Sequence, residues 1–108
     1  MMNYKEHLES FIKNLRDKNF YAAHEDLESI WFPRRFEDNN EIKLLKGFIN
    51  ASVSFELLKK GKIEPSKKVW GNYLKYRDLV SSIDSIYLKN YHQIIEEIEQ
   101  MKKSFIKI

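Results

Sequence analysis

One short stretch of the chain, HEDLESIW at residues 24–31, holds a histidine, two glutamates and an aspartate. His24 and Glu28 are four residues apart, so on a helix their side chains lie one turn apart and can reach each other. An imidazole nitrogen and a carboxylate oxygen so arranged can ligate a divalent metal ion. A histidine held by a carboxylate can also act as a general acid or base. The third interpretation is structural: the two side chains hydrogen-bond, and Asn50 or backbone groups of a neighbouring helix satisfy their other polar atoms.

The spacing of apolar residues predicts a helix over residues 20–31. Its predicted core face is formed by Phe20, Ala23, Leu27, Ile30 and Trp31, and its predicted solvent face by Ala22, Glu25, Asp26 and Ser29. His24 and Glu28 fall at the rim between these faces. We therefore expect both to be largely buried and within one water molecule of each other, while Glu25 and Asp26 are exposed.

A helix predicted over residues 41–60 differs from the others because apolar residues lie nearly all round it. Such a helix is covered on several sides, so we expect it at the centre of the fold. Gly47 lies within it, although glycine costs about 1 kcal/mol relative to alanine in a helix interior. A close approach of another helix or of a ligand would offset that cost. We expect the helix at 20–31 to cross the central helix near Gly47.

This crossing would place the rim pair opposite a small polar face of the central helix. His24 and Glu28 would then be the candidate metal ligands, and Asn50, Gly47 and Trp31 would line the rest of a ligand site between the two helices. Asn50 is a polar group on this face and needs a partner if it is buried.

Helices without hairpins are expected elsewhere, because the chain has only three glycines and two prolines. The first predicted helix runs from Tyr4 to Asp17, with Asn3 and Glu6 as its capping box, and a loop at 32–40 begins near Pro33. Gly61 is the predicted cap that ends the central helix, and the next predicted helix has Pro65 in its first turn and reaches Val80. A connector at 81–89 leads to the last predicted helix, which runs from the N-cap Asn90 to Phe105. Together these elements predict an all-α single domain over residues 1–108, a bundle or array of about five helices.

The composition excludes several classes of protein. Cysteine is absent, which removes disulfides and thiolate metal sites and is typical of a reducing compartment. Charged residues begin within the first few positions, and the chain has no long apolar run. We therefore expect neither a secretory signal nor a membrane span, and we expect a cytoplasmic protein. The net charge of +3 is mild, and the basic residues lie in separate small groups. Solvated helix faces and helix ends explain these groups better than a nucleic-acid surface does.

Two longer stretches, NFYAAHEDLESIW and LKGFINASVSFELLKKGK, resemble the prokaryotic family known as domain of unknown function 309. The matched positions are His24, Glu28 and Trp31 of the hallmark H-x-x-x-E-x-x-W/Y, and Gly47, Phe48, Ile49, Asn50 and Gly61 of a second stretch. Lys18 stands where members usually have glycine, and Asn50 replaces the usual glutamine. The resemblance implies an all-helical fold and a metal-binding role for the motif, and it brings no known reaction.

Two functions from different classes therefore remain open. The first is a small protein with a divalent metal or small polar ligand bound between the helices at 20–31 and 41–60, where a metal-bound water could carry out hydrolysis. The second is a non-catalytic helical module that binds another protein, in which His24, Glu28 and Asn50 form only a structural anchor. Trp70, Tyr73 and Tyr76 are then candidate contacts to the partner, unless they pack in the core. The sequence does not decide whether the protein is an enzyme.

Overall fold

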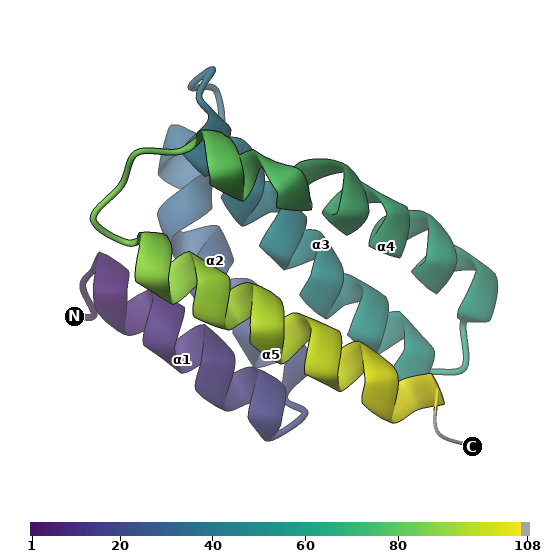
Figure 1. The fold of residues 1–108 in the computed structure, drawn as a ribbon. Helices are drawn as coiled ribbons and strands as arrows, with labels where there is room; N and C mark the ends of the chain where they lie inside the picture. The colour runs from purple at the N-terminus through teal and green to yellow at the C-terminus, as the bar shows by residue number, and fades with distance from the viewer. Residues whose placement is uncertain (107–108) are drawn as a thin grey trace.

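The computed structural model describes residues 1–106, and these form five α-helices and two 3₁₀ helices without a strand (Figure 1). The elements are α1 (Tyr4–Arg16), α2 (Phe20–Trp31), η1 (Phe32–Arg34), α3 (Asn40–Lys59), α4 (Ile63–Arg77), η2 (Asp78–Ser82) and α5 (Leu88–Ile106). The predicted all-α class and the approximate order of the five helices are confirmed.

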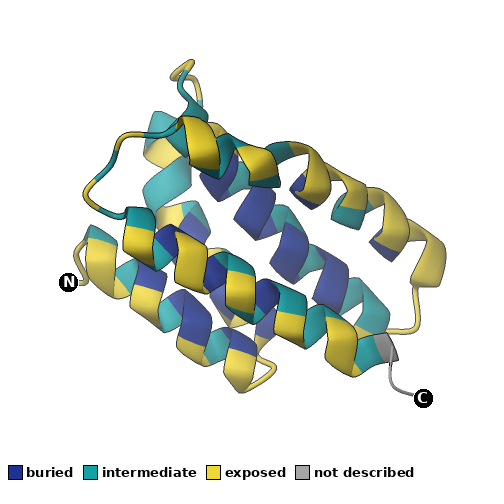
Figure 2. Cartoon of the chain, in the orientation of Figure 1, coloured by how far each residue is buried: buried dark blue, intermediate teal, exposed yellow. Residues whose placement is uncertain are grey.

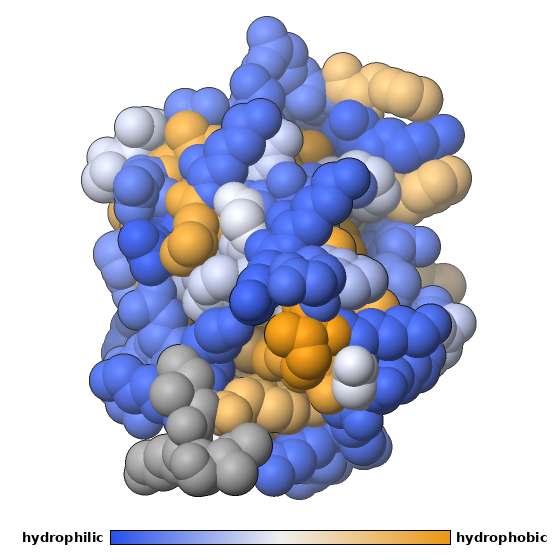
Figure 3. All heavy atoms as spheres, turned by 90° about the vertical axis from the view of Figure 1, so that its right-hand side faces the viewer, coloured by the Kyte–Doolittle hydropathy of each residue, from blue (hydrophilic) through white to orange (hydrophobic). Residues whose placement is uncertain are grey.

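Helix α3 lies at the centre of the fold, as its apolar pattern predicts. It contacts α2, α4, α5 and η2. Figure 2 shows buried residues along nearly the whole of α3, whereas the other helices alternate between buried and exposed positions. Hydrophilic residues cover most of the end of the molecule that carries the turn between α3 and α4, with hydrophobic side chains visible between them (Figure 3).

An aromatic cluster joins four of the helices around Phe55 of α3. Its ring centroid lies 5.4 Å from that of Phe20 on α2, and 5.7 Å from those of Trp70 on α4 and Phe105 on α5. Tyr73 is fully buried beside Trp70, at 4.7 Å between centroids. Trp70 and Tyr73 therefore pack in the core. Two of the three aromatic residues that were candidate contacts to a partner are thus used in core packing.

The backbone after α1 and after α3 forms the same C-terminal turn. Gly61 has a φ of 76° and donates its N–H to Leu58, while the next N–H bonds to Leu57, which is the Schellman pattern. Lys18 occupies the equivalent position after α1 with a φ of 59°. A residue with a Cβ is strained in this left-handed region, whereas glycine is not. The backbone conformation of Lys18 is therefore energetically unfavourable. Gly61 is thus confirmed as the cap of the central helix.

Helix α5 begins two residues before the predicted N-cap, so the assignment of Asn90 as that cap is wrong. Asn90 lies inside the first turn of α5, which starts at Leu88. The Oγ atom of Ser85 accepts a hydrogen bond from the N–H of Tyr87, and the carbonyl of Tyr87 already accepts from the N–H of Tyr91. Ser85 therefore organises the turn into the helix, a role that the sequence pattern does not indicate.

The helix that approaches Gly47 closely is α4, not α2, so the predicted crossing partner is wrong. A Cβ atom added to Gly47 would lie 2.8 Å from the Cβ of Tyr76 on α4. One and two turns further along the same face, Ala51 and Ser54 are fully buried. Ser54 hydrogen-bonds Ser66 of α4 through both hydroxyls, at 2.9 Å. The small residues of α3 thus form the contact with α4, and they are not available to a site on α2.

We expect Gly47 and Gly71, which both lie inside helices, to respond oppositely to the same substitution. Gly47→Ala should lower the free energy of unfolding, and Gly47→Leu should lower it by about 1–3 kcal/mol, because the new atoms collide with Tyr76. Gly71 has no neighbouring atom within 4 Å of an added Cβ, so Gly71→Ala should raise it by about 0.5–1 kcal/mol. Urea unfolding measures all three; an unchanged or more stable Gly47→Leu variant would mean that the close approach does not exist.

A polar network holds the starts of α1, α3 and α5 together. The hydroxyl of Tyr91 donates to the Oε2 atom of Glu41, which also accepts from Ser85 Oγ at 2.7 Å. The hydroxyl of Tyr4 lies 2.6 Å from that of Tyr91, so Tyr4 must be the donor in this pair. Burial, the largest effect, raises the pKa of Tyr4 to about 12 and also raises the pKa of Tyr91.

These shifts predict a loss of stability in strong alkali. The ordinary pKa of tyrosine is about 10, and the pKa of Tyr4 in the folded chain is about 12. At pH values between these two, the unfolded chain has lost a proton that the folded chain keeps. The stabilisation is therefore fully present below about pH 10 and falls as the pH rises toward about 12. Unfolding free energies measured from neutral to alkaline pH should fall more steeply for the wild type than for Tyr4→Phe. Equal slopes would contradict this assignment.

Candidate functional site

His24 and Glu28 lie within hydrogen-bond distance on one edge of α2. The Nε2 atom of His24 is 2.6 Å from the Oε2 atom of Glu28, which confirms the expected proximity. Their side chains are 23% and 43% exposed, so the expectation that both are largely buried is wrong. The reason is the position of α4, which covers the Gly47 face of α3 and leaves this edge of α2 uncovered.

The pair is arranged as a hydrogen bond and not as two ligands around an ion. Ligand atoms that share one metal at 2.0–2.2 Å lie roughly 3.4 Å apart in tetrahedral geometry, whereas 2.6 Å is a short charge-assisted hydrogen bond. Metal binding would therefore require the two side chains to separate. Within residues 1–106, no group of three or more histidine, aspartate and glutamate side chains is placed to hold a metal ion.

The other predicted lining residues lie in two different places. Asn50 donates from Nδ2 to the carbonyl of Lys46 at 2.7 Å and accepts from Asn72 of α4 at 3.3 Å, so it faces α4 together with Gly47. Trp31 is partly buried at the end of α2, with the ammonium of Lys46 4.4 Å from its ring centroid. The hydrogen bonds of Asn50 therefore join it to α3 and α4, and not to His24 and Glu28.

Asp26 is buried rather than exposed, which corrects its assignment to the solvent face of α2. Its Oδ2 atom accepts hydrogen bonds from Ser10 at 2.7 Å and from Asn14 at 2.8 Å, both on α1. The Nδ1 atom of His7 lies 3.5 Å from the other carboxylate oxygen and is buried without a hydrogen-bond partner of its own. Asp26 thus forms the polar anchor between α1 and α2. Ser10 and Asn14, four residues apart in a predicted helix, were the signal that could have located it.

The segment after α2 forms a second candidate site, which we call the aromatic tip and define as Phe32, Arg35 and Phe36. The guanidinium carbon of Arg35 lies 3.6 Å from the ring centroid of Phe32 and 4.4 Å from that of Phe36. Phe32 is 49% exposed and Phe36 is 88% exposed. The segment projects from the helices at the top of Figure 1. The sequence predicts a loop here, but not that its aromatic rings enclose an arginine.

The fold and these sites define a small all-helical protein whose second helix carries the histidine–glutamate–tryptophan motif. The chain belongs to the family described as domain of unknown function (DUF309), whose family model matches residues 8–69. This range begins within α1, covers α2 and α3, and reaches into α4. No curated protein and no solved structure matches the chain. Over the part of the chain that is described, no helix is long and apolar enough to cross a membrane.

The burial of the two carboxylates predicts which of them stabilises the fold. Asp26→Ala should lower the free energy of unfolding by about 1–3 kcal/mol, because it leaves the partly buried donors of Ser10 and Asn14 without their acceptor. Glu28→Ala should cost only about 0.5 kcal/mol, because it removes a partly exposed pair one helical turn apart. Thermal and urea unfolding of both variants measures the difference.

The same measurement tests metal binding if it is made with chelator and with zinc. A metal that binds the folded wild type should raise its stability by about 2.7 kcal/mol at a hundredfold excess over Kd, and Glu28→Ala should lose that gain. Identical melts with chelator and zinc would contradict the metal site. A loss in Glu28→Ala as large as that in Asp26→Ala would contradict the assignment of Asp26 as the main anchor.

Proposed function

We propose that this protein is a non-catalytic helical module that binds another protein through its aromatic tip. The observation that carries the proposal is the arrangement of Arg35 between two exposed aromatic rings. Aromatic residues and arginine dominate the energetics of protein interfaces. An apolar side chain such as Phe36, almost fully exposed at a projecting position, buries a large area when a partner covers it.

The tip is ordered before any partner arrives. Arg35 donates from Nη1 to the carbonyl of Phe32 at 2.6 Å, and Arg34 makes a two-pronged ion pair with Glu37 at 2.9 and 3.0 Å. Lys43 of α3 pairs with Asp38 at 3.0 Å. Because these contacts already fix the loop, less conformational entropy is lost on binding. No carboxylate among residues 1–106 forms an ion pair with Arg35, so its remaining N–H donors can meet one on a partner.

The motif residues of α2 lie next to the base of the aromatic tip. Trp31, the third motif residue, packs edge-on against Phe32 at 6.4 Å between centroids, and Lys46 lies over the Trp31 ring. His24 and Glu28 bond to each other one and two turns earlier on the same helix. In this proposal the motif is a structural device that stabilises α2 and fixes the base of the tip.

A divalent metal at His24 and Glu28 is the second candidate. Its support is that these two ligand types lie side by side and partly exposed. Two protein ligands would leave the remaining positions of the ion to water, and a metal-bound water is the nucleophile of hydrolytic metal centres. We also propose a cytoplasmic location, which the absence of cysteine supports.

The proposal predicts that a photo-crosslinking amino acid captures a partner from the tip. With p-benzoylphenylalanine at position 36, irradiation of cells that express the protein should give one discrete cross-linked product. The same amino acid at Leu74, an exposed apolar position on α4, should not give this product. Arg35→Ala and Phe36→Ala should reduce co-purification of that partner by about tenfold or more.

Stability provides the control for these variants. Because Phe36 is almost fully exposed, Phe36→Ala should change the free energy of unfolding by no more than about 0.5 kcal/mol. The proposal fails if position 36 gives no discrete product, or if Leu74 gives the same one. It also fails if Arg35→Ala and Phe36→Ala keep full partner binding.

A further inference from the structure

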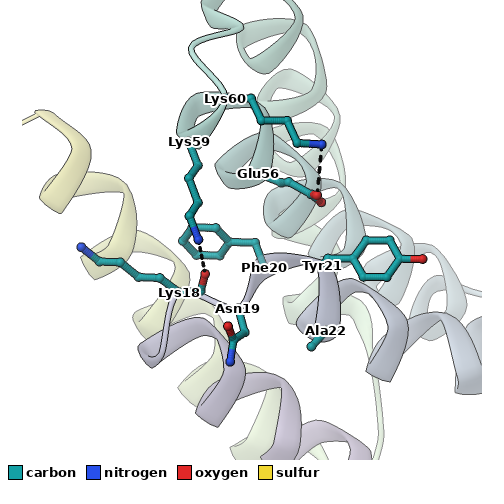
Figure 4. Close-up of a pocket in the computed structure, with 8 residues that line it drawn as sticks. All are labelled: Lys18, Asn19, Phe20, Tyr21, Ala22, Glu56, Lys59 and Lys60. Atoms are coloured by element: carbon teal, nitrogen blue, oxygen red, sulfur yellow. Dashed lines mark hydrogen bonds and ion pairs between the residues drawn. The ribbon is translucent and has the colours of Figure 1, made fainter.

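A groove of about 570 Å³ opens at the other end of α2, between the turn that follows α1 and the last turn of α3. It is lined by Lys18, Asn19, Phe20, Tyr21, Ala22, Glu56, Lys59 and Lys60. Figure 4 shows Lys59 and Phe20 on one side, Glu56 and Tyr21 on the other, and the first turn of α2 between them. Phe20, Tyr21 and Ala22 give the groove an apolar part, and three lysines surround it.

The groove adjoins the family motif. The ring of Tyr21 forms one wall and meets the ring of His24 edge-on, at 5.9 Å between centroids. Tyr21 is 60% exposed, whereas Phe20 beneath the groove is 2% exposed and belongs to the core. An occupant would therefore lie against a fixed floor and an accessible aromatic wall.

The charges around the groove favour an anion. Lys60 is paired with Glu56 at 3.4 Å, but Lys59 donates only to the carbonyl of Lys18, at 3.2 Å. Neither Lys18 nor Lys59 forms an ion pair with a carboxylate among the described residues. At the floor, the first turn of α2 has no side-chain cap, so its partial positive charge faces the groove without a local acceptor. These features give the apolar groove a net positive rim.

We propose that this groove binds a segment of a partner protein in which an apolar side chain stands next to an aspartate or glutamate. The apolar side chain lies between Tyr21, Ala22 and the aliphatic stem of Lys59. The carboxylate pairs with the ammonium of Lys59. The proposal goes beyond the aromatic tip, because it assigns a separate surface at the opposite end of α2.

The openness of the groove favours a peptide segment over a small molecule. A small ligand normally buries 70–90% of its surface in a closed pocket, and this groove is open to solvent along one side. A peptide keeps its outer face in solvent and needs only one buried side chain with charged residues at the rim. Lysine stems that cover apolar surface adapt to such a segment.

A peptide selection tests the proposal. A random peptide library displayed on phage is selected on the immobilised protein, and enriched peptides are measured by fluorescence anisotropy. We expect peptides with an apolar residue adjacent to aspartate or glutamate. Lys59→Glu should raise Kd by about tenfold or more, and Ala22→Trp, which fills the groove, should do the same. Raising the salt concentration from about 50 to 300 mM should weaken binding.

Matched variants separate this surface from the rest of the molecule. Lys5→Glu places the same charge change at an exposed position near the start of α1, and it should leave Kd within about twofold. Phe36→Ala should also leave Kd unchanged, so failure here is distinct from failure of the aromatic tip. Circular dichroism checks the fold, and Lys59→Gln replaces Lys59→Glu if the latter unfolds.

The proposal is overturned if no peptide is enriched, or if the enriched peptides lack acidic residues. It is also overturned if Lys59→Glu and Ala22→Trp leave Kd unchanged. Free indole-3-acetate tests a small carboxylate as the alternative ligand. If it displaces the peptides at low concentration and binds alone with equal affinity, the groove is a small-molecule site instead.

Discussion

The close contact between α3 and α4 determines how the rest of the molecule is arranged. Gly47 lets Tyr76 approach the backbone of α3, and Ser54 and Ser66 join the same two helices further along. This contact uses the small-residue face of α3. Helix α2 must therefore pack on a different face, with its outer edge uncovered, which is why His24 and Glu28 are partly exposed.

Sequence periodicity was sufficient for the helices and for the central position of α3, because burial on all sides leaves apolar residues all round a helix. It also showed correctly that Gly47 needs a close neighbour. It could not identify that neighbour, since a helical wheel gives the direction of a face and not the helix that covers it. Both α2 and α4 are adjacent to α3, and assigning Gly47 to α2 placed Asn50 on the wrong side of the proposed site.

Asp26 shows the same limit at the level of one side chain. On the helical wheel Asp26 lies between Ile30 of the predicted core face and Ala22 of the predicted solvent face, and it was assigned to solvent. It is buried because Ser10 and Asn14 on α1 supply two hydrogen bonds, and burial of a carboxylate is tolerated when donors surround it. The stabilising polar cluster of α2 is thus contributed by a residue other than His24, Glu28 and Trp31.

Helix α2 links the two proposed surfaces. The groove lies at its first turn and the aromatic tip follows its last, which puts them about 18 Å apart for twelve helical residues. The His24–Glu28 bond lies between them, Tyr21 touches His24, and Trp31 touches Phe32. The motif therefore contacts a residue of each surface through the two ends of one rigid helix. In this interpretation the motif residues fix the positions of the two ends of α2, and they do not carry out a reaction at its middle.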